Sequence, residues 1–206
     1  MKNNIEDIFL DVRGLKTHFF TDEGIVKAVD GVDFTINRGR TICIVGESGC
    51  GKSITARSIL QIIDKPGKIV EGEMLLQKNS GEKIDICSLK STGKAMRKIR
   101  GKEISMIFQE PMSSLSPVHT IGDQIKEGIE LHFGISKSES RKRTIEILDL
   151  VGIPKAEERI DSYVFELSGG MRQRAMIAMA LSCQPNLLIA DEPTTALDVT
   201  TQANIL

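Results

Sequence analysis

The chain has 206 residues, of which 40% are hydrophobic and 27% are charged, a composition typical of one ordinary globular domain. Its formal net charge is −1, from 27 basic and 28 acidic residues, which excludes a positive field over the whole domain of the kind that attracts nucleic acid. The longest apolar run, residues 175–183, is about half of the roughly 20 residues that a membrane-spanning helix needs, so we expect a buried helix there.

The first residues lack the basic-then-apolar pattern of a secretory signal, so the sequence predicts a protein that stays in the cytoplasm. Reduced thiols are the default in that compartment, and no C-x-x-C pair or nearby histidine indicates a metal cage. The cysteines are Cys43, Cys50, Cys87 and Cys183. Cys50 lies in a glycine-rich loop, where it is either a reactive thiol or simply a small residue that fills the loop.

The first half of the chain is predicted to be rich in strands. β-branched residues and mixed alternation predict strands at residues 8–15 and 26–36. Residues 41–45 are nearly all apolar, which is typical of a strand buried on both faces of a parallel sheet. A glycine-rich loop follows, and then a helix is expected from residue 52 to about 63, closed by Pro66 and Gly67.

Further along, residues 72–76 and 83–87 are expected to form a strand pair around a turn, and residues 103–108 another strand. Between them lies a basic stretch, residues 90–102, which we interpret as the solvated face of a helix.

From residue 110 the pattern changes to helix and loop. A capping-box pattern at Ser136 and Glu139 predicts the start of an amphipathic helix, which Gly152 and Pro154 end. A second helix is expected from Ser168 to about Cys183.

A phosphate-loop pattern separates the strand at 41–45 from the following helix. It reads Gly46-Glu47-Ser48-Gly49-Cys50-Gly51-Lys52-Ser53, and Ile54 continues it into the helix. Its glycines allow backbone N–H groups to point at a β-phosphate without Cβ clashes. The ammonium of Lys52 is suited to the β- and γ-phosphates, and the hydroxyl of Ser53 to Mg²⁺. The pattern therefore predicts nucleotide binding.

Two acids, Asp191 and Glu192, follow the apolar residues 187–190. We expect a central strand there, with the acids at its carboxyl end, where ligands bind in α/β proteins. Nucleotide hydrolysis needs one carboxylate for Mg²⁺ and a second to polarise the attacking water. Adjacent acids before Pro193 are also typical of a solvated turn, and the phosphate loop favours the catalytic interpretation.

The helix that begins at Ser168 carries two glycines, Gly169 and Gly170, in its first turn. Ser168 is a natural N-cap, and the free N–H groups and positive end of such a helix form a second anion site. A plain helix cap with two flexible glycines is the alternative.

The phosphate loop, this helix start and the acidic strand, in that order, resemble the ATPase subunit of an ATP-binding cassette transporter, and the resemblance runs along essentially the whole chain. It implies an α/β fold with a P-loop NTPase (RecA-like) core, an N-terminal antiparallel β-subdomain and an inserted α-helical subdomain. The core comprises residues 1–108 and 184–206, and the helical subdomain residues 109–183.

The resemblance also implies a role for each motif. ATP and Mg²⁺ are the expected ligands, with Asp191 on the metal side, Glu192 as general base, and Gln109 touching both Mg²⁺ and the attacking water. Phe19, or its neighbour Phe20, is expected to stack on adenine. The signature residues, Leu167, Ser168, Gly169, Gly170 and Met171, are expected to complete the ATP site of a second subunit. The D-loop residues, Ala196, Leu197 and Asp198, are expected to cross to that subunit.

A histidine that contacts the γ-phosphate is expected in the family after a further strand beyond the D-loop. The three histidines of this chain, His18, His119 and His132, all precede the acidic strand. We therefore expect an N-terminal part of a longer protein, which binds ATP but hydrolyses it poorly by itself.

Three segments, residues 26–32, 107–115 and 188–198, resemble the oligopeptide, dipeptide and nickel import branch, and Met171 fits that branch. Residues 163–166 depart from it, since Tyr-Val-Phe replaces the usual Tyr-Pro-His. The resemblance implies peptide import at the cytoplasmic face of the membrane. The implied partners are two permease subunits, a second ATPase subunit and, indirectly, an extracytoplasmic solute-binding protein, with no nucleic acid.

Other functions remain open at this point. A soluble cassette ATPase that acts on nucleic acid or ribosomes is one alternative, and an importer of nickel or another small solute is a second. A non-catalytic nucleotide-binding module is a third.

Overall fold

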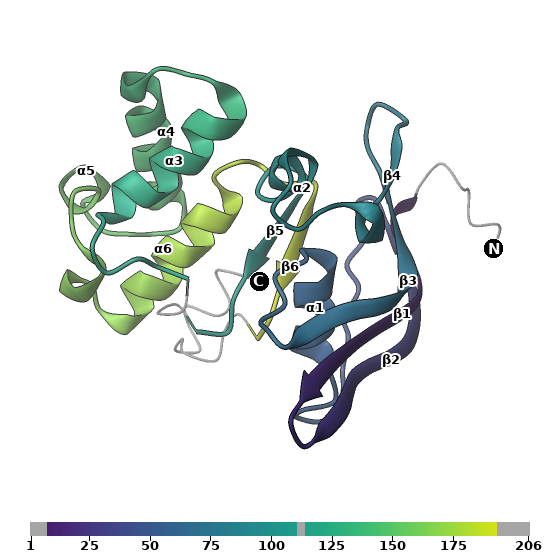
Figure 1. The fold of residues 1–206 in the computed structure, drawn as a ribbon. Coiled ribbons are helices and arrows are strands. Elements are labelled where there is room, and N and C mark those ends of the chain that lie inside the picture. The colour runs from purple at the N-terminus through teal and green to yellow at the C-terminus, as the bar shows by residue number, and fades with distance from the viewer. Residues whose placement is uncertain (1–7, 111–113, 193–206) are drawn as a thin grey trace. The chain divides into compact units, whose positions relative to one another are not determined.

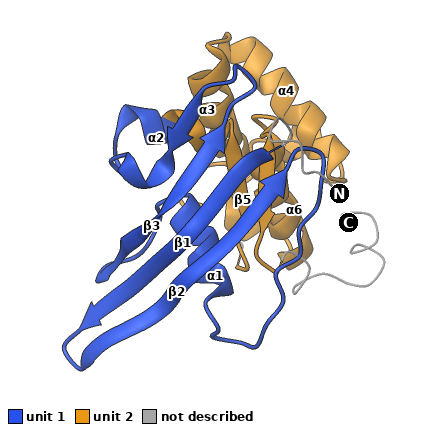
Figure 2. Ribbon diagram, turned by 90° about the vertical axis from the view of Figure 1, so that its right-hand side faces the viewer, with its two compact units in different colours: residues 1–97 blue, residues 98–206 orange. Residues whose placement is uncertain are grey.

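The computed structural model describes residues 8–110 and 114–192. The contacts of the chain divide it into two compact units, residues 1–97 and residues 98–206, which Figure 2 colours separately. Each unit is described by itself.

The first unit is built on an antiparallel sheet with the strand order β2-β1-β3-β4 (Figure 1). The strands are β1 (Ile8–Thr21), β2 (Gly24–Asn37), β3 (Gly67–Gln77) and β4 (Lys83–Asp85). β1 and β2 are longer than their apolar patterns predicted, because polar residues near the hairpin turn, such as His18 opposite Lys27, continue the backbone ladder. β3 likewise begins at Gly67, which lies opposite Phe19.

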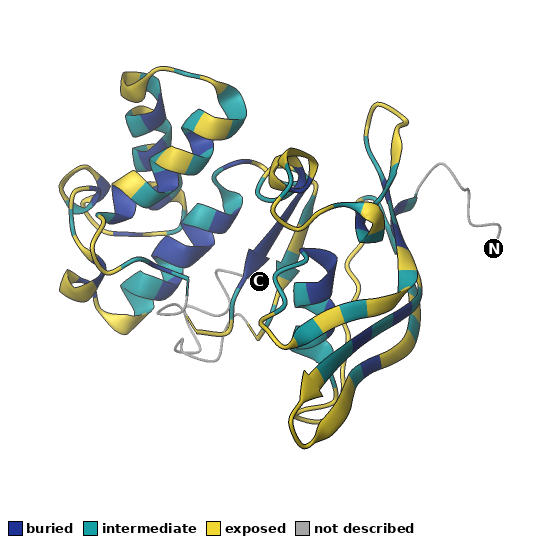
Figure 3. Ribbon diagram, viewed as in Figure 1, coloured by how far each residue is buried: buried dark blue, intermediate teal, exposed yellow. Residues whose placement is uncertain are grey.

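Helix α1 (Lys52–Ile59) packs on this sheet through one buried polar contact. The hydroxyl groups of Thr17 on β1 and Ser58 on α1 lie 2.8 Å apart, and both residues are fully buried. The helix ends earlier than the predicted residue 63, because Gln61 adopts a left-handed backbone with φ of 50°. Apolar side chains of β1 and β3 are also buried, among them Leu15 and Met74, and Figure 3 shows buried residues along the sheet.

The strand predicted at residues 83–87 is cut short. The carboxylate of Asp85 accepts a hydrogen bond of 3.0 Å from the backbone N–H of Cys87 and so caps a 3₁₀ turn, Ile86–Ser88. Local side-chain bonding of this kind competes with a strand ladder.

The strand predicted at residues 41–45 does not form. Within the part of the chain that the structure describes, these residues pair with no strand, and Val45 is 84% exposed. The expectation rested on an apolar run, but a strand is defined by hydrogen bonds to a neighbour, and such a run acquires the strand conformation only by pairing.

The basic stretch 90–102 contains a short helix, α2 (Lys94–Ile99), which spans the boundary between the two units. Only part of the stretch is a solvated face, since Met96 and Ile99 are buried.

Among its described residues, the second unit contains four helices and a 3₁₀ turn that pack on a shared apolar cluster. The elements are α3 (Ile121–Phe133), α4 (Lys137–Leu150), α5 (Ala156–Arg159), the 3₁₀ turn Val164–Glu166 and α6 (Gly169–Leu181). The cap predicted at Ser136 is confirmed, since its hydroxyl accepts a hydrogen bond of 3.3 Å from the backbone N–H of Glu139. Among the described residues, no helix combines the length and apolar character needed to cross a membrane.

Two parallel strands, β5 (Ile104–Ile107) and β6 (Leu187–Ala190), complete this unit. β5 is fully buried, and Ile107 packs against Met176, Ile177 and Ala180 of α6. β6 was expected to be a central strand. Among the described residues it has one neighbour, β5, and its side chains alternate between intermediate and exposed.

Two glycines of α3, Gly122 and Gly128, differ in the space around them, so substituting each by alanine tests the packing of the helical core. Gly122 donates a backbone hydrogen bond of 2.8 Å to the carbonyl oxygen of Ile160, and a Cβ at Gly122 would lie 2.5 Å from that oxygen. We expect Gly122→Ala to lower the free energy of unfolding by about 1–3 kcal/mol, because the backbone must move apart. At Gly128 the nearest atom to a Cβ is the Cys183 Sγ at 3.6 Å, so Gly128→Ala is expected to gain about 0.5–1 kcal/mol. Urea unfolding of both variants measures the contrast, and equal stabilities would contradict it.

Candidate functional site

The phosphate loop is held against its own sheet at Gly51, the N-cap of α1. Gly51 has φ of 96°, and a Cβ there would collide with the backbone carbonyl oxygen of Ala28 on β2. Gly49 also lies in the left-handed region, with φ of 81°. These two glycines allow the chain to turn sharply into α1, where Thr55 returns a backbone hydrogen bond of 2.8 Å to Gly51. Glycine is therefore favoured at positions 49 and 51 by the left-handed backbone, and at position 51 also by the lack of room for a Cβ.

Lys52 curls back over the loop. Its Nζ donates hydrogen bonds of 2.8 Å to the carbonyl oxygens of Gly46 and Glu47, and it lies 3.9 Å from the Cys50 Sγ. A Cβ at Gly46 would come within 2.7 Å of that sulfur, so Gly46 makes room for the Cys50 side chain. The ammonium is therefore held at the mouth of an exposed loop by acceptors that are uncharged, and a phosphate would be a stronger partner for it.

The two candidate aromatic residues differ in their surroundings. The Phe19 ring packs beside Gly67, where a Cβ would be 2.7 Å from its Cε1 atom. Phe20 is 40% exposed, and the Lys68 Nζ lies 4.8 Å from its ring centroid. Stacking of adenine on Phe19 stays a prediction.

In the second unit, the ends of β5 and β6 bring Gln109 and Glu192 together. The parallel register pairs Ile107 with Ala190, and the backbone N–H of Asp191 donates a hydrogen bond of 3.0 Å to the carbonyl oxygen of Ile107. Two residues further on, the Gln109 Nε2 donates a hydrogen bond of 2.9 Å to the Glu192 Oε2. Glu192 has φ of 48°, a left-handed conformation that is uncommon for a residue other than glycine. No sequence pattern indicated this direct contact, because it depends on the register of two strands far apart in the chain.

The signature helix begins as predicted. The Ser168 hydroxyl accepts a hydrogen bond of 3.3 Å from the backbone N–H of Met171, which confirms the N-cap. Leu167 is buried, whereas Ser168 and Gly169 are exposed. A Cβ at Gly169 or at Gly170 would meet no atom within 4 Å, so packing inside this chain does not require glycine at either position.

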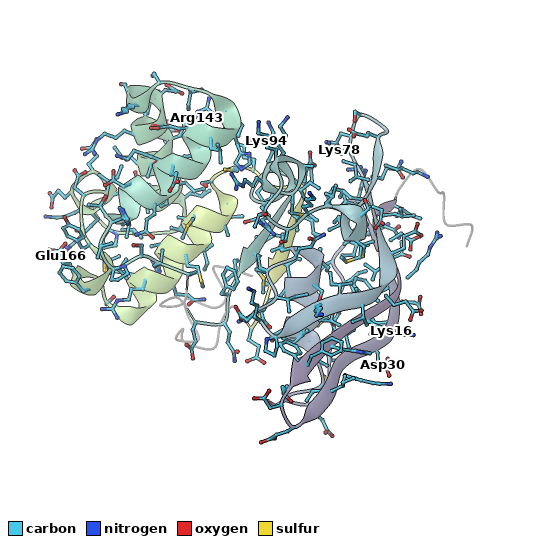
Figure 4. The ribbon with its side chains drawn as sticks, in the orientation of Figure 1. Lys16, Asp30, Lys78, Lys94, Arg143 and Glu166 are labelled. Carbon is cyan, nitrogen blue, oxygen red and sulfur yellow. The ribbon has the colours of Figure 1, made fainter. Side chains whose placement is uncertain are left out.

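The segment before the signature is fixed by bonds that sequence reasoning missed. The Arg172 Nε donates a hydrogen bond of 2.9 Å to the carbonyl oxygen of Val164. The carboxylate of Glu166, which Figure 4 labels, accepts a hydrogen bond of 2.7 Å from the backbone N–H of Tyr163. Val164, which stands where the import branch usually has proline, is fully buried. The rings of Tyr163 and Phe165 stack at 5.4 Å. This departure from the branch pattern therefore leaves the start of α6 well anchored.

The donors available for Mg²⁺ are oxygen atoms. In the first unit, Ser53 in the first turn of α1 offers a hydroxyl oxygen. In the second unit, Asp191 after β6 and Gln109 after β5 offer carboxylate and amide oxygens, and each of these donor types suits Mg²⁺. Among the described residues, no group of three or more His, Cys, Asp or Glu side chains is placed to hold a metal ion. The D-loop candidates, Ala196, Leu197 and Asp198, lie outside the described residues.

The sequence matches the ABC transporter family over residues 29–195, and the chain belongs to that family as an ATPase domain. The α/β fold of the cassette is likewise that of its structural neighbours.

Several relatives carry names from peptide import or transport. The chain is 52% identical over 201 residues to a probable peptide ABC transporter ATP-binding protein of Sinorhizobium fredii, covering 97% of this chain and 58% of the relative. It is 53% identical over 198 residues to the oligopeptide transport ATP-binding protein AppD of Bacillus subtilis, covering 96% of this chain and 58% of the relative. The chain thus spans somewhat over half the length of these relatives.

Two solved structures are similar to the fold. The dimeric ATP-binding cassette MJ0796 bound to ADP and Pi superimposes with a TM-score of 0.82 at 28% identity, over 95% of this chain and 79% of that one. The cbiO1 protein of Clostridium perfringens, part of the transporter complex cbiONQ, gives 0.69 at 29% identity, over 97% and 71%.

The four cysteines separate into two classes that chemical labelling can distinguish. Cys43 and Cys50 are exposed, whereas burial raises the pKa of the Cys87 thiol to about 11, assisted by the nearby Asp85 carboxylate. At pH 8 only about one Cys87 thiol in a thousand is ionised, so we expect iodoacetamide to modify Cys43 and Cys50 first. Burial also raises the pKa of Cys183, and it should react slowly as well. Peptide mass spectrometry over time measures the order, and early modification of Cys87 would contradict it.

Proposed function

We propose that this chain is the ATP-binding and ATP-hydrolysing part of a subunit that energises an ABC importer, with peptides as the transported solute. The observation that carries the nucleotide part is the loop of Lys52, whose ammonium is presented to an exposed, glycine-lined turn at the start of a helix. Free N–H groups at a helix start and an ammonium on one loop are suited to the phosphates of ATP.

The chemistry that follows from the candidate residues is hydrolysis of the β–γ phosphate linkage. Glu192 takes a proton from water, the water oxygen bonds to the γ-phosphorus, and the bond to the bridging oxygen breaks to give ADP and phosphate. Lys52 steadies the phosphate oxygens and Asp191 stands on the metal side. Mg²⁺, when bound, neutralises charge on those oxygens.

The signature supports a site that two subunits share. Ser168 and Gly169 are exposed at a capped helix start, and neither Gly169 nor Gly170 is needed for packing within the chain. Bare backbone at that position allows a nucleotide held by another subunit to approach the helix N–H groups closely. Relatives support this assembly, because MJ0796 is described as dimeric with ADP and Pi.

The importer and its solute rest on the relatives. Those at about 50% identity are named as peptide import or transport ATP-binding proteins. We therefore assign two permease subunits as the membrane partners, a solute-binding protein as an indirect partner outside the cytoplasm, and the cytoplasmic face of the membrane as the location.

Binding and hydrolysis can be separated with three variants of the full-length protein. Lys52→Ala should weaken Mg-ATP binding about 10- to 100-fold, because a charge-assisted contact to the phosphates is lost. Glu192→Gln should retain binding but lose about 10²- to 10⁴-fold in turnover, because the base is removed. Lys16→Ala removes a lysine that pairs with Glu71 at 2.7 Å on the sheet, and serves as the matched control with normal binding. Calorimetric titration and phosphate release are the measurements. Unchanged affinity in Lys52→Ala would contradict the assignment of the phosphate loop.

If two subunits share an ATP site at the signature, the helix caps at Ser168 and Ser136 should contribute equally to stability, but only Ser168 should contribute to dimer formation. Ser168 and Ser136 each accept a hydrogen bond of 3.3 Å from a backbone N–H three residues on, so alanine at either should cost about 1 kcal/mol of stability. In a Glu192→Gln background, ATP should produce a dimer, and only Ser168→Ala should weaken it, by about tenfold. Analytical ultracentrifugation with and without ATP measures this. Equal dimerisation of the two serine variants would count against a nucleotide shared at the signature.

A further inference from the structure

The proposed function assigns no role to the basic stretch at residues 90–102. Six lysine and arginine residues lie in these 13 positions, and no aspartate or glutamate lies among them. They are Lys90, Lys94, Arg97, Lys98, Arg100 and Lys102. The whole chain, in contrast, has a formal net charge of −1. Positive charge is therefore concentrated in one short segment of a chain that is otherwise slightly acidic.

Helix α2 gives the middle of this stretch an apolar side and a basic side. Met96 and Ile99 are buried, whereas Lys94, Arg97 and Lys98 are exposed. Positions three and four apart lie on the same face of a helix, so these three cations share one face. All three belong to a single helix, and that helix alone sets their spacing. Figure 4 labels Lys94, the first residue of the helix.

The basic face of α2 differs from the basic residues of the neighbouring helices. Lys126 pairs with Asp123 at 2.8 Å on α3, and Arg143 pairs with Glu139 at 3.2 Å on α4. Among the described residues, the three exposed cations of α2 have no carboxylate partner of this kind. Like charges three or four residues apart also destabilise the helix that carries them. The charge of α2 thus opposes the folding of its own helix, and it is suited to an anion outside the chain.

The residue types of the stretch distinguish between kinds of polyanion. Single-stranded nucleic acid is held by aromatic side chains on which bases stack, and residues 90–102 contain no aromatic residue. A protein partner needs an apolar centre in its interface, and Met96 and Ile99, the long apolar side chains of α2, are buried. A layer of anionic lipid headgroups needs neither feature, because clustered cations attract it by charge alone.

We propose that the basic face of α2, formed by Lys94, Arg97 and Lys98, binds the anionic lipid headgroups of the membrane. Lys90 and Lys102 are also exposed and flank the helix in the chain, so they add to the positive field. Each cation within a screening length of an anionic surface strengthens the attraction. The choice of a membrane rests on the proposed function, which locates the chain at the cytoplasmic face. The contact holds the subunit against lipid in addition to its permease partners.

The test measures sedimentation of the full-length subunit, without permease, with lipid vesicles. The vesicles contain phosphatidylcholine alone or phosphatidylcholine with about a third phosphatidylglycerol, which is anionic. The α2 variant carries Lys94→Gln, Arg97→Gln and Lys98→Gln. The control variant removes the same number of positive charges from lysines that already pair with an acid, by Lys27→Gln, Lys78→Gln and Lys155→Gln.

We expect the parent to bind the anionic vesicles but not the phosphatidylcholine vesicles, and to be released at about 1 M salt, where the screening length falls to about 3 Å. The α2 variant should bind the anionic vesicles about 10- to 100-fold more weakly, because three cations leave the binding face. The control variant should stay within about threefold of the parent, since charges far from the lipid are screened. Urea unfolding should show no loss of stability in the α2 variant, because the replaced side chains are exposed and repel one another.

Three results would overturn the proposal. If the parent does not bind anionic vesicles, the basic face does not recognise lipid. If both variants lose binding equally, net charge rather than α2 decides the affinity. If the parent binds a DNA duplex more tightly than the anionic vesicles, and the α2 variant does not, the face is a nucleic-acid site. ATP turnover is a separate readout: a parent that binds these vesicles but hydrolyses no ATP contradicts the proposed function and leaves the lipid-binding face in place.

Discussion

The parallel ladder between β5 and β6 is the constraint on which the chemistry of the second unit depends. Four residue pairs fix the register, and this register decides which side chains emerge together at the carboxyl ends of the strands. Gln109 and Glu192 meet there although 83 positions separate them in the chain. The position of the signature helix α6 depends on the same ladder, because Met176, Ile177 and Ala180 of α6 pack against Ile107 of β5. A shift of one residue in the ladder would disturb all of these positions.

The first unit positions its loop in a different way. The phosphate loop is exposed, and beside the hydrogen bonds of Lys52 within it, its shape depends on the start of α1. The carbonyl oxygen of Ala28 leaves no room for a side chain at Gly51, and the buried Thr17–Ser58 contact ties α1 to β1. The antiparallel sheet is thus a rigid base for the start of α1, while the residues that would bind phosphate stay accessible.

The sequence predicted best what depends on neighbouring residues. The phosphate loop, the caps at Ser136 and Ser168 and the acidic pair after residue 190 were recognisable because their chemistry requires certain residue types at short spacing. The strand expected at 41–45 was wrong because an apolar run does not supply a partner strand. The contact between Gln109 and Glu192 could not be predicted, since it requires the relative register of two strands. The resemblance to a family suggested both residues, but not that one would hold the other.

The backbone of Glu192 has a consequence for how such a protein changes under selection. A left-handed conformation costs a residue with a Cβ about 1–2 kcal/mol, whereas glycine adopts it freely and asparagine does so more easily than glutamate. At this position stability therefore favours glycine, whereas the proposed role of Glu192 as general base requires a carboxylate. A population of variants selected only for resistance to heat would drift towards glycine or asparagine at position 192, and the loss of the carboxylate would go unnoticed until ATP turnover was required again.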